Sequence, residues 1–128
     1  MMRIFIEDSF DSAHWLPKVP LAHKCRQMHG HTYRIRIEFE CAMDKRMGWL
    51  VDYSVVKPYW DMIHKRLDHH VLNEIDGLEN PTCERIAEYI ATELQGYLIR
   101  LMPNRPISVA RIELRETVKC GVVWEAES

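Results

Sequence analysis

The feature that most constrains this chain is a two-residue alternation over residues 29–41. A β-strand places successive side chains on opposite faces of its sheet, whereas a helix would show a period of 3.6. One face of this segment is apolar and begins with two histidines, and the other is mostly charged. The odd positions are His29, His31, Tyr33, Ile35, Ile37, Phe39 and Cys41, and the even positions are Gly30, Thr32, Arg34, Arg36, Glu38 and Glu40. The pattern predicts a strand of an antiparallel sheet with one buried and one solvated face.

Three further strands and two helices are expected around this segment. The predicted strands are 3–12, 29–41, 107–116 and 122–126, and the predicted helices are 54–68 and 83–101. Thr82 is a plausible N-cap for the second helix, and Gly121 falls in or near the last turn. This order predicts an α+β domain in which two helices cover one face of a four-stranded antiparallel sheet. The edge strands of such an open sheet invite pairing with another subunit.

Length and charge narrow the functional classes. We expect the 128 residues, 1–128, to form one domain, because this is an ordinary domain length. Lys and Arg number 17 against 19 Asp and Glu, so no general attraction to nucleic acid or an anionic membrane is expected. No apolar run approaches the ~20 residues of a membrane helix, and charge appears too early for a signal peptide. The expected location is the cytosol, with four unpaired cysteines.

The His29-Gly30-His31 sequence predicts a metal site. Two histidines at i and i+2 on a strand point to the same face, here the apolar one. His14 follows a strand-like run and would join them through antiparallel pairing. Three neutral imidazoles with one open position are typical of catalytic zinc. The competing interpretation is a chance pair, since seven histidines in one short chain make such pairs frequent.

Three other positions are candidates for chemistry, each with a plainer alternative. Cys25 would be a base or nucleophile beside the metal, or a fourth ligand that closes the site, and the sequence favours neither. Asp68 would orient His69 in acid–base catalysis, or would be a solvated carboxylate at a helix end. His70 could replace His69 in this catalytic role. Glu116 on an inward face would bind a ligand with N–H donors, or would be an exposed strand-end charge.

Six motifs, in order along nearly the whole chain, resemble the 6-pyruvoyltetrahydropterin synthase family. They are FDSAH at 10–14, CRQMHGHTY at 25–33, GWLVDY at 48–53, LDHHVLN at 67–73, NPTCE at 80–84 and ET at 116–117. The resemblance implies the tunnelling fold, in which subunits join their sheets into a barrel. It also implies a homohexamer with active sites between subunits.

The resemblance carries specific roles onto this chain. It implies zinc ligation by His14, His29 and His31, catalysis by Cys25, Asp68 and His69, and anchoring of the pterin ring by Glu116. The three residues between Cys25 and His29 resemble the bacterial 6-carboxytetrahydropterin synthase branch, which feeds 7-deazaguanine (queuosine) synthesis. The implied reaction converts 7,8-dihydroneopterin triphosphate to 6-carboxytetrahydropterin, acetaldehyde and triphosphate. The alternatives are 6-pyruvoyltetrahydropterin synthase activity and a non-catalytic zinc-binding module.

Overall fold

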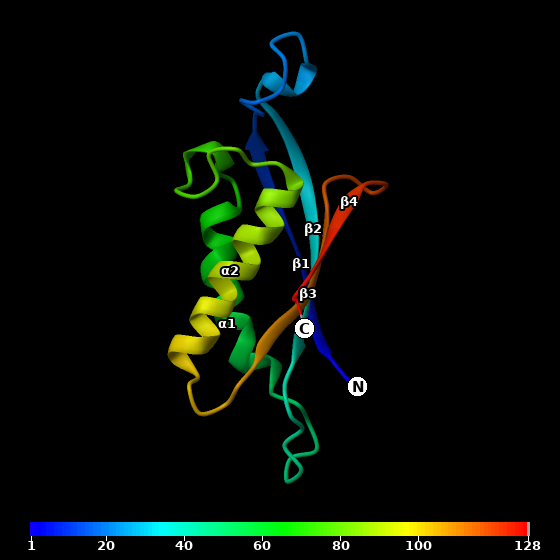
Figure 1. Ribbon diagram of the computed structural model, residues 1–128, viewed down its shortest axis with the longest axis vertical. Helices are drawn as coiled ribbons and strands as arrows, with labels where there is room; N and C mark the ends of the chain where they lie inside the picture. The colour runs from blue at the N-terminus through cyan, green and yellow to red at the C-terminus, as the bar shows by residue number, and fades with distance from the viewer. Residues whose placement is uncertain (128) are drawn as a thin grey trace.

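Four antiparallel strands form the sheet in the order β1–β2–β3–β4, and residues 1–127 are described here from a computed structural model (Figure 1). The strands are β1 (Ile4–His14), β2 (His29–Glu40), β3 (Ser108–Arg115) and β4 (Gly121–Glu125). The pairing of β1 with β2 is continuous from Ile4 opposite Phe39 to His14 opposite His29. This register brings the three predicted metal ligands to one end of the sheet.

Both long helices pack on the same face of the sheet, as Figure 1 shows. They are α1 (Tyr53–Leu67) and α2 (Cys83–Leu101), and two short 3₁₀ turns, η1 (Lys24–Arg26) and η2 (Leu72–Glu74), lie in the connections. The Asp52 carboxylate accepts from the Ser54 N–H at the start of α1, and the Thr82 hydroxyl accepts from the Arg85 N–H at the start of α2. Such caps satisfy N–H groups that have no partner inside the helix.

The core lies between the helices and the inner face of the sheet. Its largest fully buried side chains come from every layer: Trp60, Tyr33, Phe10, Phe39, Ile37, Ile63, Leu67, Leu72, Leu78, Ile86, Ile90 and Leu94. The odd positions of β2 from Tyr33 to Phe39 are buried, as the alternation predicts. Within residues 1–127, no helix combines the length and hydrophobicity that crossing a membrane requires.

The predicted fold class is confirmed, with small shifts in the element boundaries. The first strand continues two residues beyond the expected end at 12, so His14 is its last residue and pairs with His29. Gly121 is the first residue of β4 rather than a turn residue. The third strand ends at Arg115, so Glu116 lies just beyond it, at the start of the β3–β4 turn.

Candidate metal centre and acid–base residues

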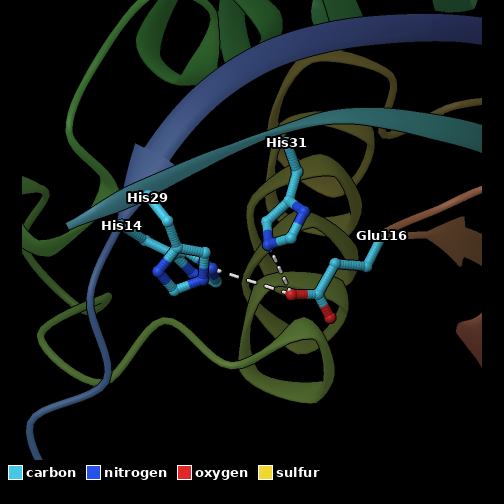
Figure 2. A group of neighbouring side chains, drawn as sticks. All are labelled: His14, His29, His31 and Glu116. Atoms are coloured by element: carbon cyan, nitrogen blue, oxygen red, sulfur yellow. Dashed lines mark ion pairs between the residues drawn. The ribbon is translucent and has the colours of Figure 1, made fainter. Parts of the chain in front are cut away.

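Three imidazole rings from β1 and β2 meet at one end of the inner face of the sheet (Figure 2). The ring centroids of His14 and His29 are 4.6 Å apart, those of His14 and His31 5.1 Å, and those of His29 and His31 5.0 Å. His29 and His31 share a face because they are two residues apart, and the strand register adds His14. Gly30, between them, presents no side chain to the opposite face.

Backbone carbonyl groups fix the orientation of two of these rings. The Nδ1 atom of His14 lies 2.8 Å from the Pro81 carbonyl oxygen, and Nδ1 of His29 lies 2.8 Å from the Gln27 carbonyl oxygen. A carbonyl can only accept, so each Nδ1 carries the proton and each Nε2 carries a lone pair. This is the usual arrangement of metal-binding histidines, whose second nitrogen donates to a carbonyl or carboxylate.

The environment of His14 and His31 favours the neutral form of both rings. Burial lowers the pKa of His14 and of His31 below the ordinary 6.5, and the neighbouring histidines lower them further. The Nε2 atoms of both residues are buried and make no hydrogen bond of acceptable geometry. Buried polar atoms without partners are rare in proteins. Lone pairs from neutral imidazoles that converge in this way fit a divalent metal ion with nitrogen ligands.

The Glu116 carboxylate reaches into the same cluster (Figure 2). Its Oε1 atom lies 2.9 Å from Nε2 of His31 and 3.7 Å from Nε2 of His14. One ligand atom from each of His14, His29, His31 and Glu116 lies within 4.8 Å of the others, so these residues could hold one metal ion. Tetrahedral zinc bonds of ~2.0–2.1 Å place ligand atoms about 3.3 Å apart, which needs only small side-chain adjustments.

Cys25 lies in the loop between β1 and β2, in the 3₁₀ turn η1. The loop is tied back to the end of β1, because the Leu16 N–H donates to the Cys25 carbonyl at 2.8 Å. The Cys25 N–H donates to Nδ1 of His23, and Cys25 is half-buried. Within the described residues, the converging group of possible metal ligands contains Glu116 and does not contain Cys25.

Asp68 and His69 follow α1 and lie along the outer edge of β1. The Asp68 carboxylate accepts from the Asp11 N–H at 2.9 Å and contacts Nδ1 of His69 at 2.9 Å. These two bonds, the backbone bond first, lower the pKa of Asp68. The bond to Asp68 is the main cause of the raised pKa of His69. The geometry is that of a carboxylate that orients an imidazole and stabilises its charged form.

The Asp68–His69 pair is separate from the histidine cluster within one chain. His69 lines a hollow at the edge of the β1–β2 pair, together with Asp11, Ser12, His31 and Thr32. The Asp11 and Thr32 side chains point away from the cluster, because their positions alternate with Ser12, His14, His29 and His31. The structure therefore brings together the predicted metal ligands and Glu116, while the predicted acid–base pair is held at the edge of β1, outside that group.

The sequence did not reveal some of the groups that contribute to the site. The carbonyl groups of Pro81 and Gln27 orient the rings, but a backbone carbonyl leaves no signal in residue types. Cys83, buried at the start of α2, lies near Glu116. Burial, with smaller contributions from Glu116 and Glu84, raises the pKa of its thiol to about 12, so Cys83 stays protonated and is a poor nucleophile.

Residues 3–127 match the family described as 6-pyruvoyl tetrahydropterin synthase. The chain belongs to this family. It is 39% identical over 100 residues to a 6-carboxy-5,6,7,8-tetrahydropterin synthase of Synechocystis, covering 74% of this chain and 76% of that protein. It is 32% identical over 125 residues to a dihydroneopterin monophosphate aldolase of Pyrococcus furiosus, covering 96% of each.

The fold agrees with the family. The solved structure of 6-pyruvoyl tetrahydropterin synthase from Caenorhabditis elegans superposes with a TM-score of 0.83, at 22% identity, over 98% of this chain and 96% of that one. At 22% identity, this similarity supports the tunnelling fold and carries no conclusion about activity. The predicted family and fold are thus confirmed, and the chain is a pterin synthase-type enzyme by family.

Proposed function

We propose that this chain is a zinc-dependent 6-carboxytetrahydropterin synthase that acts on 7,8-dihydroneopterin triphosphate. The observation that carries the proposal is the convergence of three imidazoles, two of them fixed with Nε2 inward by carbonyl groups. The similarity to a protein named for this activity supports the branch of the family. The reaction would release acetaldehyde and triphosphate and, for the atoms to balance, would consume one water.

Zinc is the metal that this donor set suits best. Imidazole nitrogen is a preferred zinc ligand, and three such ligands are typical of catalytic sites. When bound, the ion would act as a Lewis acid on substrate oxygens. The chain's own contribution is to orient His14 and His29 through backbone carbonyl groups and to favour the neutral form of His14 and His31, since protonated rings cannot ligate.

Glu116 would anchor the pterin ring. Its carboxylate is about one-third exposed and lies at the start of the turn between β3 and β4, so it can contact ligand groups beside the cluster. A carboxylate that faces two adjacent N–H donors forms charge-assisted hydrogen bonds. The 2.9 Å distance between Oε1 of Glu116 and Nε2 of His31 supports an anchor beside the proposed ion.

Cys25 would take a proton as thiolate, and His69, oriented by Asp68, would exchange another. Because the Asp68–His69 pair lies at the edge of β1, outside the converging group of possible metal ligands, we propose that it serves an active site completed by another copy of the chain. The phosphate groups would meet basic side chains such as Lys24 or Arg26 in the β1–β2 loop.

A homohexamer would provide the second copy. Among the described residues, the outer edge of β4 has no strand beside it, and the edge of β1 is covered only near its end, by the segment after α1. Uncovered edges are suited to strand pairing between subunits. We place this assembly in the cytosol.

The deciding experiment incubates zinc-loaded protein with dihydroneopterin triphosphate and identifies the products by mass spectrometry. The proposal expects 6-carboxytetrahydropterin together with acetaldehyde. A 6-pyruvoyl product would instead assign triphosphate elimination alone, and no turnover by zinc-loaded protein would favour a non-catalytic zinc-binding module. The relative from Pyrococcus furiosus motivates a parallel incubation with dihydroneopterin monophosphate. Turnover of the monophosphate in place of the triphosphate would assign the aldolase activity.

A further inference from the structure

Asp11, on β1, lies at the centre of the contacts that hold the Asp68–His69 pair. The His69 N–H donates to the Asp11 carbonyl at 2.6 Å, and the Asp11 N–H donates to Oδ1 of Asp68 at 2.9 Å. One residue of the sheet therefore contacts both members of the pair. Two residues further along, the Ala13 N–H donates to the His70 carbonyl at 3.1 Å. The segment after α1 is thus fixed to the edge of β1.

These contacts hold His69 in an unfavourable backbone conformation. Its φ is +59°, and it is the single residue other than glycine with positive φ among the described residues. A left-handed conformation costs an L-residue free energy, and it persists only where neighbouring bonds impose it. The bonds to Asp11 and Ala13 flank His69 directly, so β1 fixes the backbone from which the ring projects, and Asp68 orients the ring.

The Asp11 side chain is itself held in place from β2. Thr32 lies opposite Asp11 in the strand register, and its hydroxyl donates to Oδ1 of Asp11 at 2.5 Å. Asp11 and Thr32 line the same hollow as His69. The carboxylate therefore has a fixed position in the hollow that His69 also lines.

The charges around His69 come from several elements. Asp68 contributes the largest upward shift of its pKa, and the Asp11 charge adds to it. His70 and His31 border the hollow, and His64 near the end of α1 contacts the Ser9 carbonyl through Nε2. Two carboxylates thus act on His69, and three other histidines lie around the hollow and the end of α1.

We propose that Asp11 is a positioning residue for the Asp68–His69 pair: its backbone fixes the pair on the edge of β1, and its carboxylate, held by Thr32, stabilises the charged imidazole of His69. This inference rests on the proposed function, which gives the pair its acid–base role. It assigns to the FDSAH motif a task besides supplying His14.

The test is the Asp11→Asn variant, which keeps the shape and both backbone bonds and removes the charge. The His69 ring is titrated by NMR in the intact protein, and kcat is measured against pH. We expect the pKa of His69 to fall by about half a unit, the effect of one charge several ångströms away in water. The limb of the kcat profile that reports His69 should move by the same amount. Glu7→Gln removes a carboxylate from the same face of β1 and should leave both curves unchanged.

A second pair of variants distinguishes loss of the Asp11 interaction from a folding defect. Thr32→Val removes the donor that holds the Asp11 carboxylate, and should shift the His69 titration in the same direction as Asp11→Asn. Thr32→Ser keeps the hydroxyl and should restore the wild-type curve. An unchanged His69 titration in both Asp11→Asn and Thr32→Val would overturn the inference. The NMR measurement needs no substrate, so failure of the proposed function would appear separately, as wild-type protein that forms no pterin product.

Discussion

Oε1 of Glu116 lies 2.9 Å from Nε2 of His31, although the two residues are 85 positions apart in the chain. The contact follows from the antiparallel pairing of β2 with β3, which sets Arg115 opposite Arg34 and so carries Glu116 toward the start of β2. The proposed pterin anchor and the proposed metal ligands therefore share one small volume.

Glu116→Gln should weaken pterin binding while the chain keeps its zinc. The variant loses charge-assisted hydrogen bonds to the ligand, which corresponds to roughly a 10- to 150-fold increase in pterin Kd. Titration calorimetry with a pterin and metal analysis of the same samples give the two readouts. Glu113→Gln is the matched control, because Glu113 points to the outer face of β3 and should leave both values unchanged. Loss of zinc from Glu116→Gln would make this carboxylate a metal ligand.

Cys25→Ala should abolish turnover and leave zinc bound. Removal of a group that transfers protons lowers kcat by about 100-fold or more, whereas the metal is expected to depend on histidines alone. Steady-state assays and metal analysis check the two halves of this prediction. Cys120→Ala, at an exposed thiol, is the control that should retain activity. If Cys25→Ala lost its zinc, the closed-site interpretation of the cysteine would be correct.

Much of this arrangement could be predicted from the sequence, since the strand alternation fixes which residues share a face. The alternation over 29–41 places His29 and His31 inward, and a strand before it supplies His14. The position of Asp68 and His69 could not be predicted in this way. It depends on hydrogen bonds to Asp11, 57 and 58 positions away, and on a positive φ at His69 that residue types do not reveal.

A side chain at position 121, in place of Gly121, should lower the stability of the chain. A Cβ there would lie 2.2 Å from the Leu114 carbonyl oxygen and 2.8 Å from the Arg115 Cα, so the β3–β4 pair would have to move. We expect Gly121→Ala to lower the free energy of unfolding by about 1–3 kcal/mol. Gly96→Ala, within α2 and in open space, should instead raise it by up to about 1 kcal/mol. Urea denaturation of both variants measures the difference, and equal effects at the two positions would contradict it.

Acid should destabilise the metal-free chain through the buried histidines. The pKa of His14 and of His31 lies below 6.5 in the folded chain, mainly because of burial. As the pH falls below about 6.5, the unfolded chain binds protons that the folded chain does not. The free energy of unfolding should therefore decrease from pH 6.5 down to the folded pKa values.

Denaturation in the presence of a chelator at several pH values measures this slope. A His14→Gln variant should show a shallower slope than wild type. His70→Gln should keep the wild-type slope, because that ring is exposed and lies outside the histidine cluster. A wild-type stability that rises on acidification over this range would contradict the assignment.

The proposed function depends above all on zinc held by His14, His29 and His31, and the sharpest test of this site is metal analysis of purified wild-type and His31→Ala protein. We expect about one zinc per chain in the wild type, and loss of most of it in a His31→Ala variant that circular dichroism shows to be folded. His70→Gln should retain full zinc. A folded His31→Ala variant with undiminished zinc would show that these histidines do not hold the metal.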